Sequence, residues 1–233
     1  MRIEVSLTPA LYPFRTIKNG HTTVAIDVLR ATTAVCAAFQ AGCSSVVPLD
    51  SLDALSKYRE LGYSVAAERG GKKLDYAEYG NSPTEYLQQD MTGKKLAYST
   101  TNGTVSILRA ADAECTLVGS FANLTALTQR LRLDTRDVVL LCSGWQNDFC
   151  IEDTLLAGAI IEKMSDVAVP FGDAAHMAIA MWNVACDDVR AYCERCSHVH
   201  RLEGFGAARD VDFAFRRDTC PVVPQLSDGK LAI

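Results

Sequence analysis

The stretch Val24–Thr33, which reads VAIDVLRATT, decides the fold of this chain. It begins as an apolar, β-branched strand of the kind that is covered on both faces. It ends in four polar side chains, those of Asp27, Arg30, Thr32 and Thr33. The small residues Ala34–Ala41 then predict a helix, so the polar loop is expected at the carboxyl end of a sheet. Because helix-start N–H groups attract anions, the stretch predicts an α/β protein with a metal or phosphate site.

Length and composition narrow the class of protein. The 233 residues are 48% hydrophobic and contain no linker or low-complexity tract, which predicts one domain over residues 1–233. Nine cysteines without regular spacing are typical of a reducing cytoplasm rather than of a disulfide framework. A net charge of −5 disfavours a general nucleic-acid surface, and no apolar run is long enough to cross a membrane. We therefore expect a cytoplasmic protein, for which a homodimer is a compatible assembly.

Two further units repeat the order of the opening stretch. Strands are predicted over Lys95–Ser99 and Asp137–Cys142, and each is followed by a polar loop and a helix. The helical segments of the first two units align without a gap, with Thr32 opposite Thr104. This order predicts a three-layer α/β/α fold with a mixed, mainly parallel sheet and a duplicated core.

Beyond residue 170 the sequence pattern is mostly helical. Helices are predicted over Gly172–Ala185 and Asp187–Cys196, whereas Val211–Phe215 is ambiguous. The turn residues at 227–229 predict a hairpin with arms at Val222–Val223 and Lys230–Ile233.

Carboxylates at the ends of strands are the first candidates for chemistry. Asp27 follows a strand too apolar to bear an unpaired charge, so it is expected to meet a cation or Arg30. Glu68 follows a short predicted strand. Glu152 and Asp153 stand at the start of a predicted helix, where one acid would suffice to complement the helix macrodipole. The presence of two acids there therefore suggests a functional role for one of them. Carboxylates suit Mg²⁺, and an arginine can clamp a phosphate. The alternative to a site is an ordinary strand–helix turn with a local Asp27–Arg30 ion pair.

Several other phosphatase and metal signatures are incomplete. A phosphoaspartyl mechanism has a second Asp two positions after the first, where Leu29 stands here. A cysteine phosphatase has an Arg six positions after its nucleophile, whereas Asp148 stands at that distance from Cys142. No G-x-x-x-x-G-K-[ST] or G-x-G-x-x-G loop is present. Cys193 and Cys196 lack a second pair at finger spacing, so zinc is disfavoured there despite the nearby histidines.

Seven ordered segments resemble those of one family. They are VAIDVLRATT at 24–33, AERGG at 67–71, YGNSP at 79–83, STTNGT at 99–104, CSGWQNDFCIEDTLLAG at 142–158, GDAAHMA at 172–178 and VVPQLSDGKL at 222–231. On these segments the chain resembles the 2-phosphosulfolactate phosphatases of the ComB type over nearly its whole length. The resemblance implies a Mg²⁺-dependent acid phosphatase with an α/β fold, which hydrolyses the phosphate ester of 2-phospho-3-sulfolactate on the route to coenzyme M. This chain departs from the family next to the Glu–Asp pair, where Cys150 and Ile151 follow Phe149.

The resemblance also implies roles for individual residues. Asp27, Glu68 and Asp153 become the candidates for metal ligands and for the catalytic acid or base. The candidate contacts to a small anionic phosphorylated substrate are Arg30, Thr32, Thr33, Asn102 and Thr104, together with Arg69, Asn81, Ser82, Thr101, Gly103, Ser143 and Gly144.

We expect a carboxylate to orient the attacking water while Mg²⁺ and the loops hold the phosphate, with a covalent phospho-Asp27 as a variant. The alternatives are a phosphatase of another phosphorylated carboxylic acid, a non-catalytic binder of phosphorylated metabolites and a structural subunit.

Overall fold

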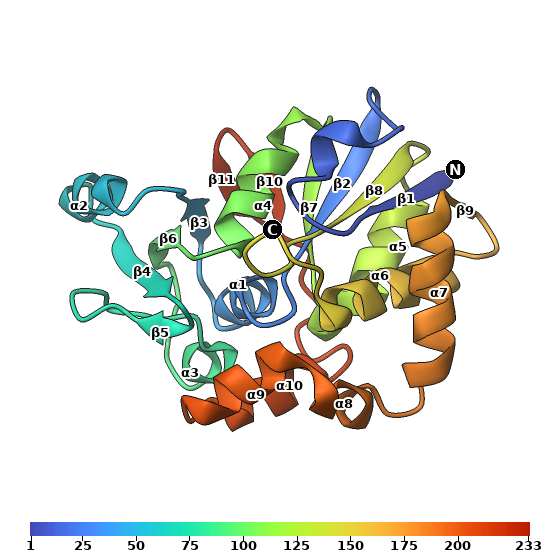
Figure 1. Cartoon of the computed structure of the whole chain (residues 1–233). Helices are drawn as coiled ribbons and strands as arrows, with labels where there is room; N and C mark the ends of the chain where they lie inside the picture. The colour runs from blue at the N-terminus through green and yellow to red at the C-terminus, as the bar shows by residue number, and fades with distance from the viewer.

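Eleven strands form a single sheet in the computed structural model, which describes residues 1–233 (Figure 1). From one edge to the other they are β5 (Lys72–Lys73), β4 (Ser64–Arg69), β6 (Lys95–Ser99), β3 (Ser45–Pro48), β11 (Lys230–Ala232), β10 (Gln225–Ser227), β7 (Cys115–Gly119), β2 (His21–Ile26), β8 (Asp137–Cys142), β1 (Arg2–Ser6) and β9 (Val169–Phe171).

Ten α-helices surround this sheet (Figure 1). They are α1 (Ala31–Gln40), α2 (Asp53–Glu60), α3 (Pro83–Leu87), α4 (Gly103–Arg109), α5 (Leu124–Arg132), α6 (Ile151–Lys163), α7 (Asp173–Ala185), α8 (Val189–Tyr192), α9 (Ser197–Gly204) and α10 (Ala208–Ala214). Four 3₁₀ turns occur at Tyr12–Phe14, Ala110–Asp112, Phe121–Asn123 and Cys193–Arg195. None of the helices has both the length and the apolar character needed to cross a membrane.

The middle strands are buried on both faces, as their apolar sequences require. On β8, Val138 and Leu140 belong to the largest hydrophobic cluster, which includes Ile160 of α6. Val139 of the same strand belongs to a different cluster, with Tyr12. Because successive side chains of a strand point to opposite faces, each face of the sheet needs its own cover. The predicted three-layer α/β/α arrangement is therefore confirmed.

A β-hairpin joins two parallel halves of the sheet. Strands β4, β6 and β3 are parallel to one another, and so are β7, β2, β8, β1 and β9. Between the halves lie β10 and β11, which pair antiparallel with each other and with the strand on either side. Two crossovers, β2–α1–β3 and β6–α4–β7, connect the halves. Each has the order of strand, polar loop, helix and strand that repeats in the sequence.

The twist of the sheet explains how loops from the two halves can meet. Three antiparallel pairings separate the halves, so in a flat sheet the loops after β2 and β6 would lie at opposite edges. These two strands are five steps apart in the sheet order. A twist of roughly 20–25° per step rotates one relative to the other by about 100–125°. The loops are in direct contact, since a Cβ built on Gly103 would lie 2.2 Å from the Cβ of Ala31.

Two predicted elements need correction. The hairpin arm predicted at Val222–Val223 is wrong, because the strand is β10 at 225–227. Prolines at 221 and 224 flank the predicted arm, and proline cannot donate a hydrogen bond to a strand ladder. The single helix predicted over Asp187–Cys196 is instead α8 followed by a 3₁₀ turn. The ambiguous segment Val211–Phe215 lies mostly in α10, and α1 begins three residues before its predicted start.

We predict that Gly158→Ala lowers the free energy of unfolding by about 1–3 kcal/mol, the usual cost of overpacking. Helices α6 and α7 meet at Gly158, where a Cβ would lie 2.3 Å from the carbonyl oxygen of Ala178 and 2.6 Å from the Cβ of Trp182. Urea unfolding measures the change. The matched control is Gly204→Ala on α9, which has open space around it and is expected to leave stability unchanged or slightly raised. Equal stability of the two variants would contradict this packing.

Candidate active site

Five loops and one distant helix meet at a narrow cavity of about 10 Å³, roughly the space that one water molecule occupies. The loops follow β2, β4, β5, β6 and β8, and the helix is α9. The polar and aromatic residues that line the cavity are Asp27, Arg30, Glu68, Asn81, Asn102, Trp145, His198 and Arg201. Five of these were predicted from the sequence as site residues: Asp27, Arg30, Glu68, Asn81 and Asn102.

Asp27 is a buried acid with one carboxylate oxygen that has no hydrogen-bond partner in the protein. The N–H of Ala31 donates to its Oδ1 at 3.1 Å, while Oδ2 accepts no hydrogen bond from the protein. Burial raises the pKa of Asp27 to about 6, with a further increase from the charges of Glu68 and Glu152. His198 and the Ala31 N–H act in the opposite direction. The Asp27 carboxylate is therefore short of positive partners.

The alternative that Asp27 pairs with Arg30 is wrong. Arg30 Nη1 lies 2.5 Å from Oδ2 of Asp210, and Nη2 donates to the carbonyl of Gly71 at 2.8 Å. Asp210 belongs to α10, a helix that the sequence pattern left ambiguous, so this partner was not foreseen. Both outer nitrogens of Arg30 are thus engaged within the protein.

Glu68 ties the loop after β4 to the loop after β6. Its Oε1 accepts a hydrogen bond from the N–H of Thr101 at 2.6 Å, and its Oε2 accepts one from Gly71 at 2.7 Å. An ionised carboxylate has about four acceptor sites, so each oxygen keeps a lone pair for a further partner. The side chain is only 4% exposed, which leaves that partner to come from the cavity.

Asp153 ties the loop after β2 to the loop after β8. Its Oδ1 accepts from Val28 N–H at 2.9 Å, and its Oδ2 accepts from Ser143 and Gly144 at 3.1 Å each. Burial and the charges of Glu152 and Asp27 raise the pKa of Asp153, whereas the bonds from Val28 and Gly144 oppose this. Asp153 does not line the cavity. The geometry gives it a positioning role, and its function as a metal ligand stays a prediction.

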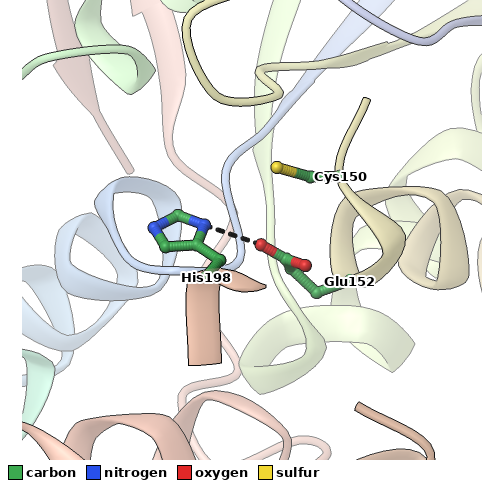
Figure 2. A group of neighbouring side chains, drawn as sticks. All are labelled: Cys150, Glu152 and His198. Carbon is green, nitrogen blue, oxygen red and sulfur yellow. Dashed lines mark hydrogen bonds and ion pairs between the residues drawn. The ribbon is translucent and has the colours of Figure 1, made fainter. Parts of the chain in front are cut away.

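Glu152, His198 and Cys150 form a buried group beside the cavity, shown in Figure 2. His198 Nδ1 lies 2.8 Å from Glu152 Oε1. An ionised carboxylate can only accept, so Nδ1 carries the proton, and Figure 2 shows the second ring nitrogen pointing away from Glu152. Burial and the neighbouring carboxylates raise the pKa of the Cys150 thiol, which disfavours the thiolate needed for metal binding. We therefore interpret the group as a carboxylate–histidine pair next to a neutral thiol.

Most of the predicted hydroxyl contacts bond to the protein rather than face the cavity. Thr32 Oγ1 donates to the carbonyl of Asp27, and Thr33 Oγ1 donates to Val28. Thr104 Oγ1 bonds in the same way to Thr100, which reproduces the Thr32 arrangement in the second unit. These three hydroxyls hold their loops on the following helices.

The other predicted contacts surround the cavity without lining it. Arg69 Nη2 donates to Ser99 Oγ at 2.9 Å, and Ser82 caps α3 and donates to Asp210. Thr101 and Ser143 line another hollow, which shares Asn102 with the cavity. Gly103 and Gly144 contribute backbone: φ is +59° at Gly144, and a Cβ on Gly103 would lie 2.7 Å from Asp27 Oδ2.

Sequence reasoning missed the side chains that α9 brings to the site. His198 was considered only with zinc, and Arg201 was not considered at all. Helix α9 begins nearly fifty residues after the loop that follows β8. No motif in the sequence predicts that this helix packs over the carboxyl ends of the strands. Trp145, from the loop after β8, contacts both: its ring centroid lies 5.5 Å from that of His198 and 3.2 Å from Cζ of Arg201.

The side chains around the cavity suit a divalent cation. Asp27 offers a free Oδ2 and Glu68 offers unused lone pairs, while Glu152 adds negative charge nearby. Carboxylate oxygens are the ligands that Mg²⁺ prefers, and it usually takes one or two from the protein. The raised pKa of Asp27 reflects negative charge that such a cation would neutralise.

The sequence matches one known family. The family described as 2-phosphosulpholactate phosphatase has a sequence model that matches residues 6–229. A protein of Synechococcus sp. (strain JA-3-3Ab) is 36% identical over 219 residues, or 90% of each chain. One from Thermotoga petrophila is 34% identical over 208 residues, 89% of this chain and 90% of that protein. One from Clostridium acetobutylicum is 30% identical over 236 residues, 99% of this chain and all of that protein. Each of the three bears the name "Probable 2-phosphosulfolactate phosphatase".

We predict that Asp27→Asn stabilises the metal-free protein at neutral pH. The pKa of Asp27 is higher in the folded state than its ordinary value, so its ionisation costs stability as the pH rises from about 4 to about 6. In EDTA the variant should gain about 3 kcal/mol over the parent above pH 6, and little below pH 4. Urea unfolding across this pH range measures the difference, and a gain that does not depend on pH would contradict the electrostatic cause.

The pKa of Asp153 is also raised, but three main-chain N–H groups donate to its carboxyl oxygens, against one for Asp27. We therefore expect the lost hydrogen bonds to dominate in Asp153→Asn, with a net loss of about 1–3 kcal/mol at neutral pH. One of its two terminal atoms would become an NH₂ group that faces a main-chain N–H, so at least one of the three buried donors loses its acceptor. Asp50→Asn is the matched control, because Asp50 is exposed. Unchanged unfolding midpoints in all variants would show that the loops do not depend on this carboxylate.

Proposed function

This chain belongs to the 2-phosphosulpholactate phosphatase family, and on that premise we propose that its cavity hydrolyses the phosphate ester of 2-phospho-3-sulfolactate. The products are 3-sulfolactate and inorganic phosphate, and the reaction lies on the route to coenzyme M. The observation that carries the proposal is that the buried acids Asp27 and Glu68 line one cavity together with the cationic side chain of Arg201, while Glu152 lies beside it. The negatively charged oxygens of a phosphate ester are stabilised by a metal ion and by hydrogen-bond donors.

Asp27 and Glu68 are the residues that would hold Mg²⁺. When bound, the ion supplies Lewis acidity and neutralises charge on the phosphate oxygens. The protein's own contribution is rigidity, because the N–H groups of Thr101 and Gly71 fix both oxygens of Glu68. Phosphoryl transfer depends mainly on positioning and charge stabilisation, so fixed carboxylates are the feature that matters most.

The free Oδ2 of Asp27 suits the attacking group. This oxygen can accept a hydrogen bond from a water molecule and so orient the water toward phosphorus. Because the transition state of phosphoryl transfer is loose, the reaction does not require a strong base. The same oxygen is compatible with direct attack to form phospho-Asp27. Gly103 keeps the space next to this oxygen open, since any larger side chain would collide with it.

His198 is placed to protonate the leaving oxygen. Glu152 holds the ring through Nδ1, and the ring lines the cavity. In its protonated form the ring donates from Nε2 to the alkoxide of the departing hydroxy acid, and Glu152 stabilises the imidazolium. The alkoxide of an aliphatic alcohol is a poor leaving group, so this proton contributes to the rate.

A basic entrance favours an anionic substrate. Lys72, Lys73 and Arg209 line an open hollow that shares Arg30 and Asn81 with the cavity. Exposed cations beside a cleft raise the local concentration of anions, and they do so less at high salt. Glu85 and Asp210 lie in the same hollow, so the attraction is local.

We predict that Asp27→Asn and Glu68→Gln each lower phosphate release from 2-phospho-3-sulfolactate by at least about a hundredfold, because each removes charge that positions the metal and the phosphate. Phosphate release is measured with Mg²⁺ and with EDTA, and the exposed carboxylate variant Asp50→Asn serves as the control. The phosphatase proposal fails if the unaltered protein binds the ester saturably but releases no phosphate over hours. Release of phosphate only from other phosphorylated carboxylic acids would correct the substrate.

The acid role of His198 predicts a dependence on the leaving group. His198→Gln should reduce kcat strongly for the alkyl ester, but much less for 4-nitrophenyl phosphate, whose leaving group needs little protonation. His200→Gln is the control, because His200 is exposed on the same helix. An equal loss for both esters would indicate that His198 acts through structure rather than through proton transfer.

A further inference from the structure

Arg201 carries a buried guanidinium without a partner. Its Nε, Nη1 and Nη2 atoms are all buried, and none has a hydrogen-bond partner within the protein. Among the other arginines, only Nε of Arg15 and Nη1 of Arg190 share this condition, and both of those side chains have bonds elsewhere. A guanidinium is a planar fork of five donors, and leaving all of them buried and unused is costly. The side chain is therefore built to meet something that the protein itself does not provide.

The surroundings of Arg201 fix its orientation. It projects from α9 and lines the cavity that also contains Asp27 and Glu68. Its guanidinium carbon lies 3.2 Å from the centroid of the Trp145 ring. Stacking on an aromatic face leaves the edge of a guanidinium, where its N–H groups point, available for a ligand.

The neighbouring carboxylates do not account for this arginine. No carboxylate oxygen lies within ion-pair distance of its nitrogens, although Glu68, Glu152 and Asp27 are close enough to favour its charge. Burial lowers the pKa of Arg201 and these acids raise it, yet a guanidinium stays charged in proteins. The cavity thus has both carboxylates that suit a cation and a guanidinium that suits an anion.

A second donor lies in the same cavity. The amide oxygen of Asn81 accepts a hydrogen bond from the hydroxyl of Tyr98, which leaves the NH₂ group of Asn81 without a partner in the protein. Together, Arg201 and Asn81 present only donors, and two oxygens of a tetrahedral oxyanion match the spacing of the guanidinium fork.

We propose that Arg201 is a substrate-binding residue that holds an oxyanion of the substrate. This assignment rests on the proposed phosphatase function and deepens it. The oxyanion is the phosphate group or the sulfonate group, which share the tetrahedral oxygens that a guanidinium recognises in bidentate fashion. Phosphate binding places Arg201 beside the reacting group, whereas sulfonate binding makes it the residue that selects the substrate.

Calorimetric titration with two probes separates these cases. Inorganic phosphate carries the first group, and 3-sulfolactate carries the second without phosphate. Arg201→Met keeps an unbranched, flexible side chain but removes the guanidinium and its charge, so it should raise Kd about tenfold to a hundredfold for one or both probes. A loss for phosphate alone assigns Arg201 to the reacting group, and a loss for 3-sulfolactate alone, with the affinity for lactate unchanged, assigns it to the sulfonate end. Titrations are made with Mg²⁺ and with EDTA.

Controls keep the assignment testable. Arg195→Gln alters an exposed arginine just before α9 and should change neither Kd. Removal of an unpaired buried charge should leave the ligand-free melting temperature of Arg201→Met at or above that of the parent, and Arg201→Gln is the second variant should Met not fold. Unchanged affinity for both probes in a folded variant overturns the assignment. If the parent binds phosphate through Arg201 but hydrolyses no ester, the proposed function fails and the assignment stands.

Discussion

Main-chain N–H groups that donate to buried carboxylates hold the site of this protein together. Glu68 joins the loops after β4 and β6, Asp153 joins those after β2 and β8, and Asp27 closes its own turn onto α1. A loop that moved away would leave both a buried charge and a buried N–H without a partner, and each is costly. The same bonds leave part of each cavity-facing carboxylate unused. The groups that fix the loops are therefore also the groups that can bind a ligand.

The acidic and cationic parts of the cavity have separate origins in the fold. The acids come from strand ends and the loops or helix starts that follow them, which the crossovers and the sheet twist bring together. His198 and Arg201 come from α9, and the partner that occupies Arg30 comes from α10. The acids alone would attract a metal ion. Helix α9 adds His198 and Arg201, which can donate hydrogen bonds to an anionic substrate. A site for both ligands therefore requires the helices to lie against the loops.

The sequence predicted those features of the site that depend on neighbours along the chain. Strand, loop and helix signals around Asp27 and Asn102 are local, and parallel strands bring such loops to carboxyl ends. The roles of Thr32 and Thr104 could not be predicted from the sequence. A hydroxyl at the start of a helix can hydrogen-bond either to a bound anion or to the neighbouring main chain. Arg201 could not be placed either. Its orientation follows from Val199 and Leu202, which pack into the largest hydrophobic cluster, and that contact is long-range.

The hairpin between the two halves of the sheet has a consequence for biosynthesis. Leu231 pairs with Val46 and Leu226 pairs with Thr116, so the inner edges of β3 and β7 have no neighbour until residues 225–232 have been translated. Unpaired strand edges are templates for aggregation, and contacts between segments far apart in sequence form slowly. We therefore expect the nascent polypeptide to depend on chaperones that shield these edges while it leaves the ribosome.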